Sequence, residues 1–323
     1  MIIFIGFNRQ RNNLLGYRKH PESPAHKFKT YNWLFRTAKL PAATYIFTMI
    51  DRLHVREKRL AGIIYRHINA AGEGFRALND PAKAKNRFGL LRSLHDAGIN
   101  NFDGYLASDS PKPEQFPVFV RNLSVSLPPL TDLIKNQTEL ESELARLQEW
   151  GEPLEDLVVI EYCAQPYKGD YFLKLSTYRI DDQFCLDLFI YNKGWYVKWA
   201  GPDIAPPNSS LAEWNMLQDN AFVADARRVF EIADIEYGRV DFSLVDGRPQ
   251  FYEINFNPQF TIDEYETKDP QRLKNAIFAA NRRIDAMKTL VHASDRPSIN
   301  NIKDHEITAF RLRPWRNYAP QRY

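Results

Sequence analysis

Polar side chains that could do chemistry recur at every second position of one segment, 238–258. Because the side chains of a β-strand alternate between its two faces, residues at this spacing point to one side of a sheet. The turn signal Asp246-Gly247 divides the segment into the two strands of a hairpin. The alternating polar positions are Arg239, Asp241, Ser243, Glu253, Asn255 and Asn257. Carboxylate and amide oxygens are ligands that Mg²⁺ prefers, and an adjacent arginine can neutralise phosphoryl charge.

The register of this hairpin decides whether its two carboxylates share a face. A two-residue turn would put Asp241 and Glu253 on opposite faces. A type I turn with Gly247 as a one-residue bulge puts them on the same face and separates polar from apolar positions, with Phe251 as the one exception. This separation favours the bulged turn and a metal-binding face. The alternative is a solvent-exposed sheet face with a cross-strand Arg–Glu pair.

The elements that must position this hairpin follow from hydrophobic periodicity. Besides the hairpin at 240–255, strands are expected at 44–48, 117–121, 157–163, 171–180, 184–191 and 195–199. Helices are expected at 56–71 and after four start signals. These signals are Asp80-Pro81, the Thr138/Glu141 capping box, the Ser210/Glu213 capping box and Asp269-Pro270. The second, third and fourth helices end near 98, 151 and 233. The last should bury Leu273, Ile277, Ala280, Ile284 and Met287. This order predicts an α+β fold of mixed lobes with antiparallel sheets.

Composition limits the class of protein. The chain has 323 residues, 44% hydrophobic and 26% charged, with a net charge of +3, which excludes a disordered chain or a collagen. The longest apolar stretch, 40–50, is too short for the roughly 20 residues of a membrane helix. Residues 1–7 lack the basic region and cleavage site of a signal peptide. Two cysteines, Cys163 and Cys185, cannot form a disulfide framework, so we expect a cytoplasmic location.

Both ends of the chain are basic. Glu22 is the only acid in the first fifty residues, against eight lysines and arginines, and the tail after Val291 ends in Arg311, Arg313, Arg316 and Arg322. We expect a solvated arm at each end. The alternative is that the basic ends bind an acidic partner. The small net charge favours no nucleic-acid partner.

The spacing R-x-D followed by E-x-N-x-N-P, from Arg239 to Pro258, resembles the magnesium-binding core of the ATP-grasp superfamily. The resemblance covers about 42–290. It implies two α+β lobes with antiparallel sheets that grip ATP, preceded by a small N-terminal α/β region. The parts would be a basic segment (1–40), an abbreviated α/β region (41–112), a first lobe with the hinge (113–163), a second lobe with the metal site (164–290) and a basic tail (291–323).

The resemblance also assigns roles to single residues. Asp241, Glu253 and Asn255 would hold magnesium, with two ions expected and Mn²⁺ as an alternative. Arg239 and Arg121 would act in catalysis, stabilising phosphoryl charge. The residues that would bind ATP are Arg87, Arg121, Glu161, Tyr162, Cys163, Asp170, Lys174, Arg179 and Lys198. Glu161–Cys163 would be the hinge that reads adenine through its backbone, Asp170 would meet the ribose, and the basic residues would meet phosphates or substrate. For each lone basic residue, the alternative is a surface charge.

One stretch departs from the family pattern. Many ATP-grasp ligases carry a glycine-rich flap where this chain has residues 122–129, which contain no glycine. Ser124 and Ser126 could help to bind phosphate, but Pro128 and Pro129 remove two backbone donors.

The implied function is an ATP-dependent, ADP-forming carboxylate–amine or carboxylate–thiol ligase that acts through an acylphosphate. Two alternatives remain: an ATP-grasp phosphotransferase, and a nucleotide-binding protein without turnover. The expected partners are ATP with Mg²⁺, a small-molecule or peptide carboxylate, and an amine or thiol acceptor, and no membrane is expected.

Overall fold

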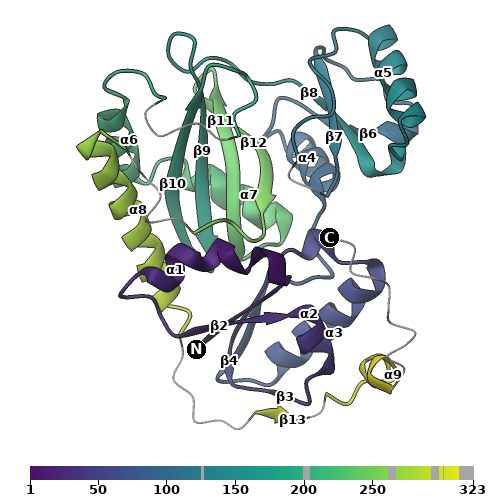
Figure 1. The fold of residues 1–323 in the computed structure, drawn as a ribbon, viewed down its shortest axis with the longest axis vertical. Coiled ribbons are helices and arrows are strands. Elements are labelled where there is room, and N and C mark those ends of the chain that lie inside the picture. The colour runs from purple at the N-terminus through teal and green to yellow at the C-terminus, as the bar shows by residue number, and fades with distance from the viewer. Residues whose placement is uncertain (125–126, 199–203, 261–266, 292–297, 301, 313–323) are drawn as a thin grey trace.

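Three main sheets divide the chain into an N-terminal domain and two lobes (Figure 1). The computed structural model describes residues 1–124, 127–198, 204–260, 267–291, 298–300 and 302–312. Ser126, Trp199, Arg313, Arg316 and Arg322, all named above, lie outside these residues. The expected α+β architecture is confirmed, and the sheets of both lobes are antiparallel. No helix in the described residues is both long and apolar enough to cross a membrane.

The N-terminal domain contains a parallel sheet of strand order β2-β1-β4-β5. Its strands are β1 (Ile2–Gly6), β2 (His26–Thr30), β4 (Ala43–Phe47) and β5 (Phe75–Leu78), and its helices are α1 (Leu15–Lys19), α2 (Tyr31–Arg36) and α3 (Val55–Ala70). Short 3₁₀ helices η1 (Asn8–Leu14) and η2 (Ile50–Arg52) follow β1 and β4. All five residues of β1 are buried, as in a strand covered on both faces.

The expected solvated arm at the N-terminus is therefore wrong. Residues 1–40 supply two strands of this sheet, so the boundary expected at residue 40 falls inside a folded domain. The described part of the tail also packs on this domain. There β13 (Ile299–Asn300) pairs with β3 (Lys39–Leu40), and Arg311 in α9 (His305–Leu312) donates to the carbonyl oxygen of Thr37 at 2.6 Å. Basic composition does not distinguish an arm from a strand whose neighbours are apolar.

Lobe 1 is a three-stranded sheet covered by one helix. It consists of β6 (Gly104–Leu106), β7 (Val118–Asn122), β8 (Leu157–Glu161), α5 (Gln137–Glu149) and the 3₁₀ helices η3 (Ala107–Asp109) and η4 (Leu154–Asp156). Helix α4 (Arg87–Asp96) connects it to the rest of the chain, because Leu91 packs with lobe 1 while Leu90 and Leu94 pack into the core of lobe 2.

Helices α4 and α5 each begin at an asparagine, whereas the sequence signals placed their N-caps at Asp80 and Thr138. The side chain of Asn86 accepts from the Gly89 N–H at 2.8 Å and caps α4, whereas Asp80 closes only a local turn. The side chain of Asn136 likewise accepts from the Glu139 N–H at 3.0 Å and caps α5, in place of Thr138. Asparagine is as good an N-cap as aspartate or threonine, so the competing signals were of equal strength.

Lobe 2 is an antiparallel sheet of order β10-β9-β11-β12. Its elements are β9 (Phe172–Ile180), β10 (Gln183–Asn192), α6 (Ser209–Asp219), α7 (Val223–Ala233), β11 (Tyr237–Val245), β12 (Arg248–Asn255) and α8 (Pro270–Lys288). The single helix expected at 210–233 is two helices, separated where Asn220 and Phe222 adopt positive φ values of 48° and 63°. The strand expected at 195–199 is absent from its described part, 195–198.

Helix α8 begins as expected, with the Asp269 side chain accepting from the Gln271 N–H at 2.9 Å. The face expected to be buried is right only in its second half, because Leu273 and Ile277 are 41% and 46% exposed. The first half instead buries Arg272, which pairs with Glu213 of α6 at 2.7 Å. That ion pair also takes Glu213 out of the expected capping box.

The N-terminal domain and lobe 2 share one core and one buried polar junction. Apolar side chains from both, including Phe4 and Tyr237, form a single cluster. Beside it lies Asn79, fully buried. Its Nδ2 donates to the carbonyl oxygens of Phe47 and Tyr237 at 2.9 and 2.8 Å. Its Oδ1 accepts from the N–H groups of Glu236 and Tyr237 at 2.9 and 2.8 Å. One amide therefore satisfies four backbone groups at the interface.

We expect Asn79→Ala to destabilise the protein by about 3–5 kcal/mol, because each buried backbone group left without a partner costs free energy. Urea unfolding measures this change. Asn12→Ala, at an exposed asparagine, is the matched control and should leave the midpoint unchanged. Equal midpoints for the two variants would show that water replaces the Asn79 amide without cost.

Candidate functional site

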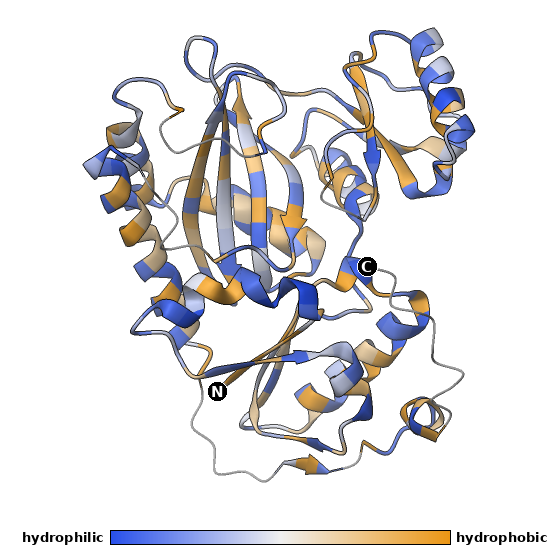
Figure 2. Ribbon diagram, viewed as in Figure 1, coloured by the Kyte–Doolittle hydropathy of each residue, from blue (hydrophilic) through white to orange (hydrophobic). Residues whose placement is uncertain are grey.

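The β11–β12 hairpin places its two carboxylates on one face, as the sequence predicts, but by a different register that sets Asp241 directly opposite Glu253. Val245 pairs with Arg248 around a two-residue turn, so the bulge expected at Gly247 is wrong. The register shifts farther along, between the pairs Asp241–Glu253 and Phe242–Phe251, which leaves Tyr252 as the extra residue. Hydrophilic and hydrophobic residues alternate along these strands (Figure 2).

This bulge also explains the one misfit in the sequence pattern. Phe251 is buried and packs against Phe242 with ring centroids 5.1 Å apart, so it lies on the apolar face. Tyr252 instead turns toward the polar side, where its hydroxyl contacts Ser243 and donates to the carbonyl oxygen of Cys163 at 2.7 Å. The hairpin is thereby tied to the hinge.

The polar face of the hairpin lines two adjoining cavities. The larger, of about 490 Å³, is also lined by the N-terminal domain, α4 and β10. The smaller, of about 120 Å³, lies between the lobes beside the hinge residues Glu161, Tyr162 and Cys163. The residues that line both cavities are Lys174, Lys198, Asp241 and Glu253. A ligand that spans the two cavities would therefore pass between these four side chains.

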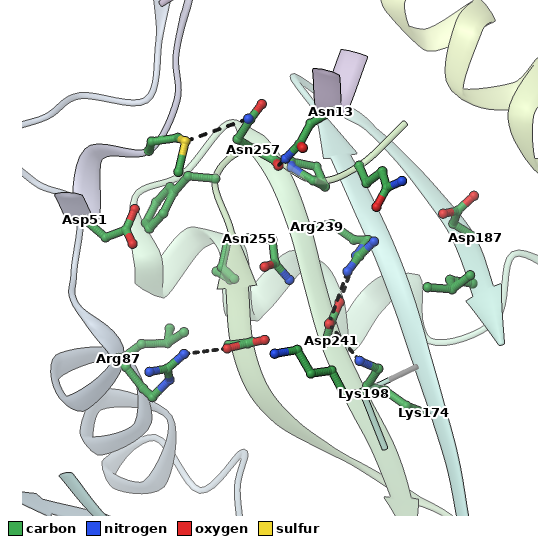
Figure 3. A pocket seen from close by; sticks show the side chains of 18 of the residues that line it. Asn13, Asp51, Arg87, Lys174, Asp187, Lys198, Arg239, Asp241, Asn255 and Asn257 are labelled. Atoms are coloured by element: carbon green, nitrogen blue, oxygen red, sulfur yellow. Dashed lines mark hydrogen bonds and ion pairs between the residues drawn. The ribbon is translucent and has the colours of Figure 1, made fainter. Parts of the chain in front are cut away.

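Asp241 is held by the two cations Arg239 and Lys174 (Figure 3) and by the hydroxyl of Ser176. Arg239 approaches it with two nitrogens, Nε at 2.8 Å from Oδ1 and Nη2 at 3.3 Å from Oδ2. Lys174 lies 3.4 Å from Oδ2, and the Ser176 hydroxyl donates to Oδ1 at 2.9 Å. Burial alone would raise the pKa of Asp241, but Arg239 and Lys174 outweigh it and hold the pKa below its ordinary value. The carboxylate is thus charged at neutral pH.

Glu253 is held from the opposite side by α4 and lobe 1. Arg87 Nη2 lies 2.6 Å from its Oε2, and Arg121 Nη2 lies 3.8 Å from the same atom. Burial opposes ionisation here too, and the two arginines again keep the pKa of Glu253 below its ordinary value. Burial and the neighbouring Arg87 both disfavour the charged form of Arg121 and lower its pKa.

These contacts leave the centre of the site with more positive than negative charge. Arg87, Arg121, Lys174 and Arg239 surround two carboxylates, and Lys198 lines the same space. A buried excess of cations attracts anions, and arginine pairs well with phosphate and carboxylate oxygens. The arrangement therefore fits a polyanionic ligand.

The residues expected to hold magnesium, Asp241, Glu253 and Asn255, supply only some of the ligands that the ion needs. A polyanionic ligand would supply others. No cluster of three or more His, Cys, Asp or Glu side chains suited to a metal occurs among the described residues. Two carboxylates and one amide are nevertheless enough for Mg²⁺ when phosphate oxygens and waters complete its shell. Asn255 pairs across the strands with Arg239, and its buried Nδ2 has no hydrogen-bond partner in the described part of the chain.

The hinge is built differently from the expectation. The carboxylate of Glu161 faces into lobe 1, where it accepts from Tyr105 Oη at 2.9 Å and from the Glu114 and Gln115 N–H groups at 2.9 and 3.0 Å. The Tyr162 N–H is also engaged, donating to the carbonyl oxygen of Pro117 at 2.9 Å. The Glu161 N–H donates to the carbonyl oxygen of Asp103 at 3.1 Å, so two of the three hinge N–H groups are used within the protein.

Two expected residues are not brought to the site. Arg179 lies an odd number of positions from Lys174 on β9, so it points to the other face of the strand. There it donates to the carbonyl oxygens of Asp181 and Ile235 at 2.8 and 2.9 Å. Asp170 is exposed and lies 3.4 Å from Lys193, and it lines neither cavity. Neither residue is therefore part of the ATP site proposed below.

An aromatic contact between the lobes was not expected from the sequence. Trp195, from the loop after β10, lies 5.1 Å from Phe119 and 5.7 Å from Tyr162 between ring centroids. The neighbouring Tyr196 donates to the carbonyl oxygen of Leu127 in the glycine-free stretch at 3.4 Å. Both residues line the smaller cavity. The adjacent aromatic residues Trp195 and Tyr196 were the available signal for this contact, but the sequence pattern was interpreted as a strand at 195–199.

No family model and no curated protein matches the chain. Among solved structures, it is similar to a D-alanine–D-alanine ligase from Bacillus anthracis, with 14% identity over 90% of this chain and 95% of that one and a TM-score of 0.49. It is also similar to a RimK domain ATP-grasp protein from Sphaerobacter thermophilus (14% identity, 88% and 98% covered, TM-score 0.43). A third is an L-amino acid ligase from Bacillus licheniformis (12% identity, 92% and 77%, TM-score 0.41). All three TM-scores are below 0.5, so the function of this chain has to be argued from its own site.

We expect Trp195→Ala to weaken the binding of ATP about tenfold, because an aromatic wall of the smaller cavity is lost and stacking on a base is worth about 1–3 kcal/mol. Calorimetry measures the affinity. Trp150→Ala is the matched control, since Trp150 is 73% exposed at the end of α5 and touches neither cavity. Unchanged affinity in the Trp195 variant would remove this residue from the binding site.

Proposed function

We propose that this chain is an ATP-grasp enzyme that uses ATP and Mg²⁺ to join a carboxylate to an amine or thiol, releasing ADP and phosphate. One observation carries the proposal: two cavities of different chemistry meet at a strip of four cations and two opposed carboxylates. The smaller cavity has aromatic and aliphatic walls suited to a base, and the larger has room and charge for a second substrate. The strip between them suits the phosphates.

In this proposal the side chains of the chain position and neutralise rather than react. Bound at Asp241, Glu253 and Asn255, Mg²⁺ would screen the charge of the phosphates, and we retain the expectation of two ions. Arg87 and Arg121 would hold the phosphate chain from the side of lobe 1. Arg239 would hold an oxygen of the moving phosphoryl group with Nη1, while Nε and Nη2 keep the guanidinium in place on Asp241.

The reaction would run in two steps. A substrate carboxylate in the larger cavity attacks the γ-phosphorus, and the bond to ADP breaks, which gives an acylphosphate. The amine or thiol then attacks the acyl carbon and phosphate leaves. Charge spreads over the phosphoryl oxygens in the first step, so cations fixed before the substrate binds lower its barrier.

A phosphotransferase would use the same strip but would stop after the first step. The volume of the larger cavity favours the ligase, because it leaves space for an acceptor beside the carboxylate. Release of free phosphate together with ADP distinguishes the two activities, and absence of ADP release with every acceptor would leave a nucleotide-binding protein.

Both cysteines are free thiols, and a cytoplasmic location remains part of the proposal.

Glu253→Gln tests the metal site. The change removes the charge that Arg87 and Arg121 share, so ATP should still bind in EDTA, while Mg²⁺ should tighten binding about 10- to 100-fold less than in the wild type. Calorimetry with ATP in EDTA and then in Mg²⁺ gives both numbers. The exposed Glu155→Gln is the control. If Mg²⁺ tightens binding equally in both variants, Glu253 is not a ligand.

Arg239→Lys tests catalysis apart from binding. Lysine keeps the charge next to Asp241 but cannot make the two-nitrogen contact, so we expect ATP affinity to hold and ADP release from basal ATP hydrolysis to fall about 100-fold. Arg248→Lys, exposed on the same hairpin, is the control. Normal ADP release by Arg239→Lys with a slightly lower melting temperature would show that the arginine only stabilises the strand pair.

A further inference from the structure

Among the residues that the structure describes, one carboxylate of the larger cavity has no cation paired with it. The carboxylates that line this cavity among the described residues are Asp51, Asp187, Asp241 and Glu253. Asp187 pairs with Arg283 at 3.2 Å, and the last two are paired as described above. Within the described ranges, Asp51 makes no ion pair within 4 Å and no hydrogen bond to another residue. In a site crowded with cations, this omission marks Asp51 as different.

The position of Asp51 in the fold is one where ligands bind. The parallel sheet runs in the order β2-β1-β4-β5, so the chain leaves β1 toward one side and returns to β4 on the other. Open α/β sheets bind ligands at the carboxyl ends of the two strands where the order reverses. Gln10 and Asn13 follow β1, Met49 and Asp51 follow β4, and all four line the larger cavity.

The backbone holds Asp51 in place. Met49, which precedes the short helix η2, adopts the left-handed conformation with φ of 54°, which is uncommon for a residue with a side chain. Its sulfur lies 3.8 Å from Nδ2 of Asn257, which also lines the cavity. Figure 3 shows the Asp51 carboxylate on the wall opposite Arg239 and Asp187, directed into the space between them.

The described residues supply no direct partner for the Asp51 carboxylate. Burial raises the pKa of Asp51, and the more distant Arg52, Arg87 and Lys58 only partly oppose this. Asp51 is half-buried, and a partly desolvated charge without a direct partner among the described residues costs free energy of folding. The missing partner must be a cation small enough for the cavity, and an ammonium group offers three donors.

We propose that Asp51 binds the ammonium group of an amine substrate, such as an amino acid or another primary amine. The inference rests on the proposed ligase function and deepens it, since it assigns an ammonium group to one of the two substrates. The ammonium group would lie against the N-terminal domain, and the opposite end of the substrate would face Arg239 and the unpartnered amide nitrogen of Asn255.

The test uses the full chain and three forms of it: wild type, Asp51→Asn and Asp182→Asn. Asp182 is exposed in the turn between β9 and β10, so its variant makes the same change of charge away from both cavities. The probes are the common L-amino acids, D-alanine and short alkylamines, each beside its N-acetylated counterpart. Melting temperature and calorimetry are measured with and without MgADP, and MgATP affinity is measured on every variant.

We expect one or more free amines, and none of their N-acetylated counterparts, to stabilise the wild type and Asp182→Asn. Asp51→Asn should bind the same amines about 10- to 100-fold more weakly, because one charge-assisted contact is lost. Its MgATP affinity should be unchanged. Without ligand it should melt at the wild-type temperature or slightly above it, because a half-buried charge without an ion-pair partner among the described residues has been removed.

Three results of the binding measurements would overturn the proposal. They are equal binding of an amine and its N-acetylated form, wild-type amine affinity in Asp51→Asn, and no stabilisation of the wild type by any amine of the panel. A clear fall in the melting temperature of unliganded Asp51→Asn would also overturn it, since the carboxylate would then serve the fold. Failure of the proposed function is a separate result, because it would appear as absent MgATP binding in the wild type.

Discussion

Repulsion between like charges is the constraint around which this structure is arranged. Four cations that come from α4, lobe 1 and lobe 2 are gathered in one small space, and in an interior of low dielectric constant they could not stay together alone. Glu253 resolves this, because Arg87 and Arg121 both meet its Oε2, at 2.6 and 3.8 Å. Glu253 of lobe 2 thus joins α4 and lobe 1 to lobe 2 through its carboxylate.

A single extra residue makes that meeting possible. The bulge at Tyr252 restores Asp241 and Glu253 to the same face after a turn that would otherwise have separated them. The same residue then reaches the carbonyl oxygen of Cys163, so the position of the hinge and the facing of the carboxylates depend on one local distortion. Bulges beside functional sites commonly aim side chains in this way.

Alternation of side chains made the facing of Asp241 and Glu253 predictable from sequence, because faces depend only on parity within a strand. Parity did not locate the bulge, since a bulge at the turn and one at Tyr252 give the same faces, and the misfit of Phe251 was the one clue. Asp51 and Trp195 were not predictable, because each reaches the site through packing between distant parts of the chain. The buried β1 was mistaken for an arm because charge was weighed over residues 1–40 as a whole.

The shared core around Asn79 has a consequence for how the molecule comes apart. The N-terminal domain and lobe 2 bury apolar side chains in one cluster, whereas lobe 1 has a separate small cluster behind α5. Regions with few long-range contacts open locally at a lower free energy than the global transition. Lobe 1 should therefore exchange its amide hydrogens as one early-opening unit. A ligand that fills the space between the lobes would slow that exchange and leave the exchange of the other two parts almost unaltered.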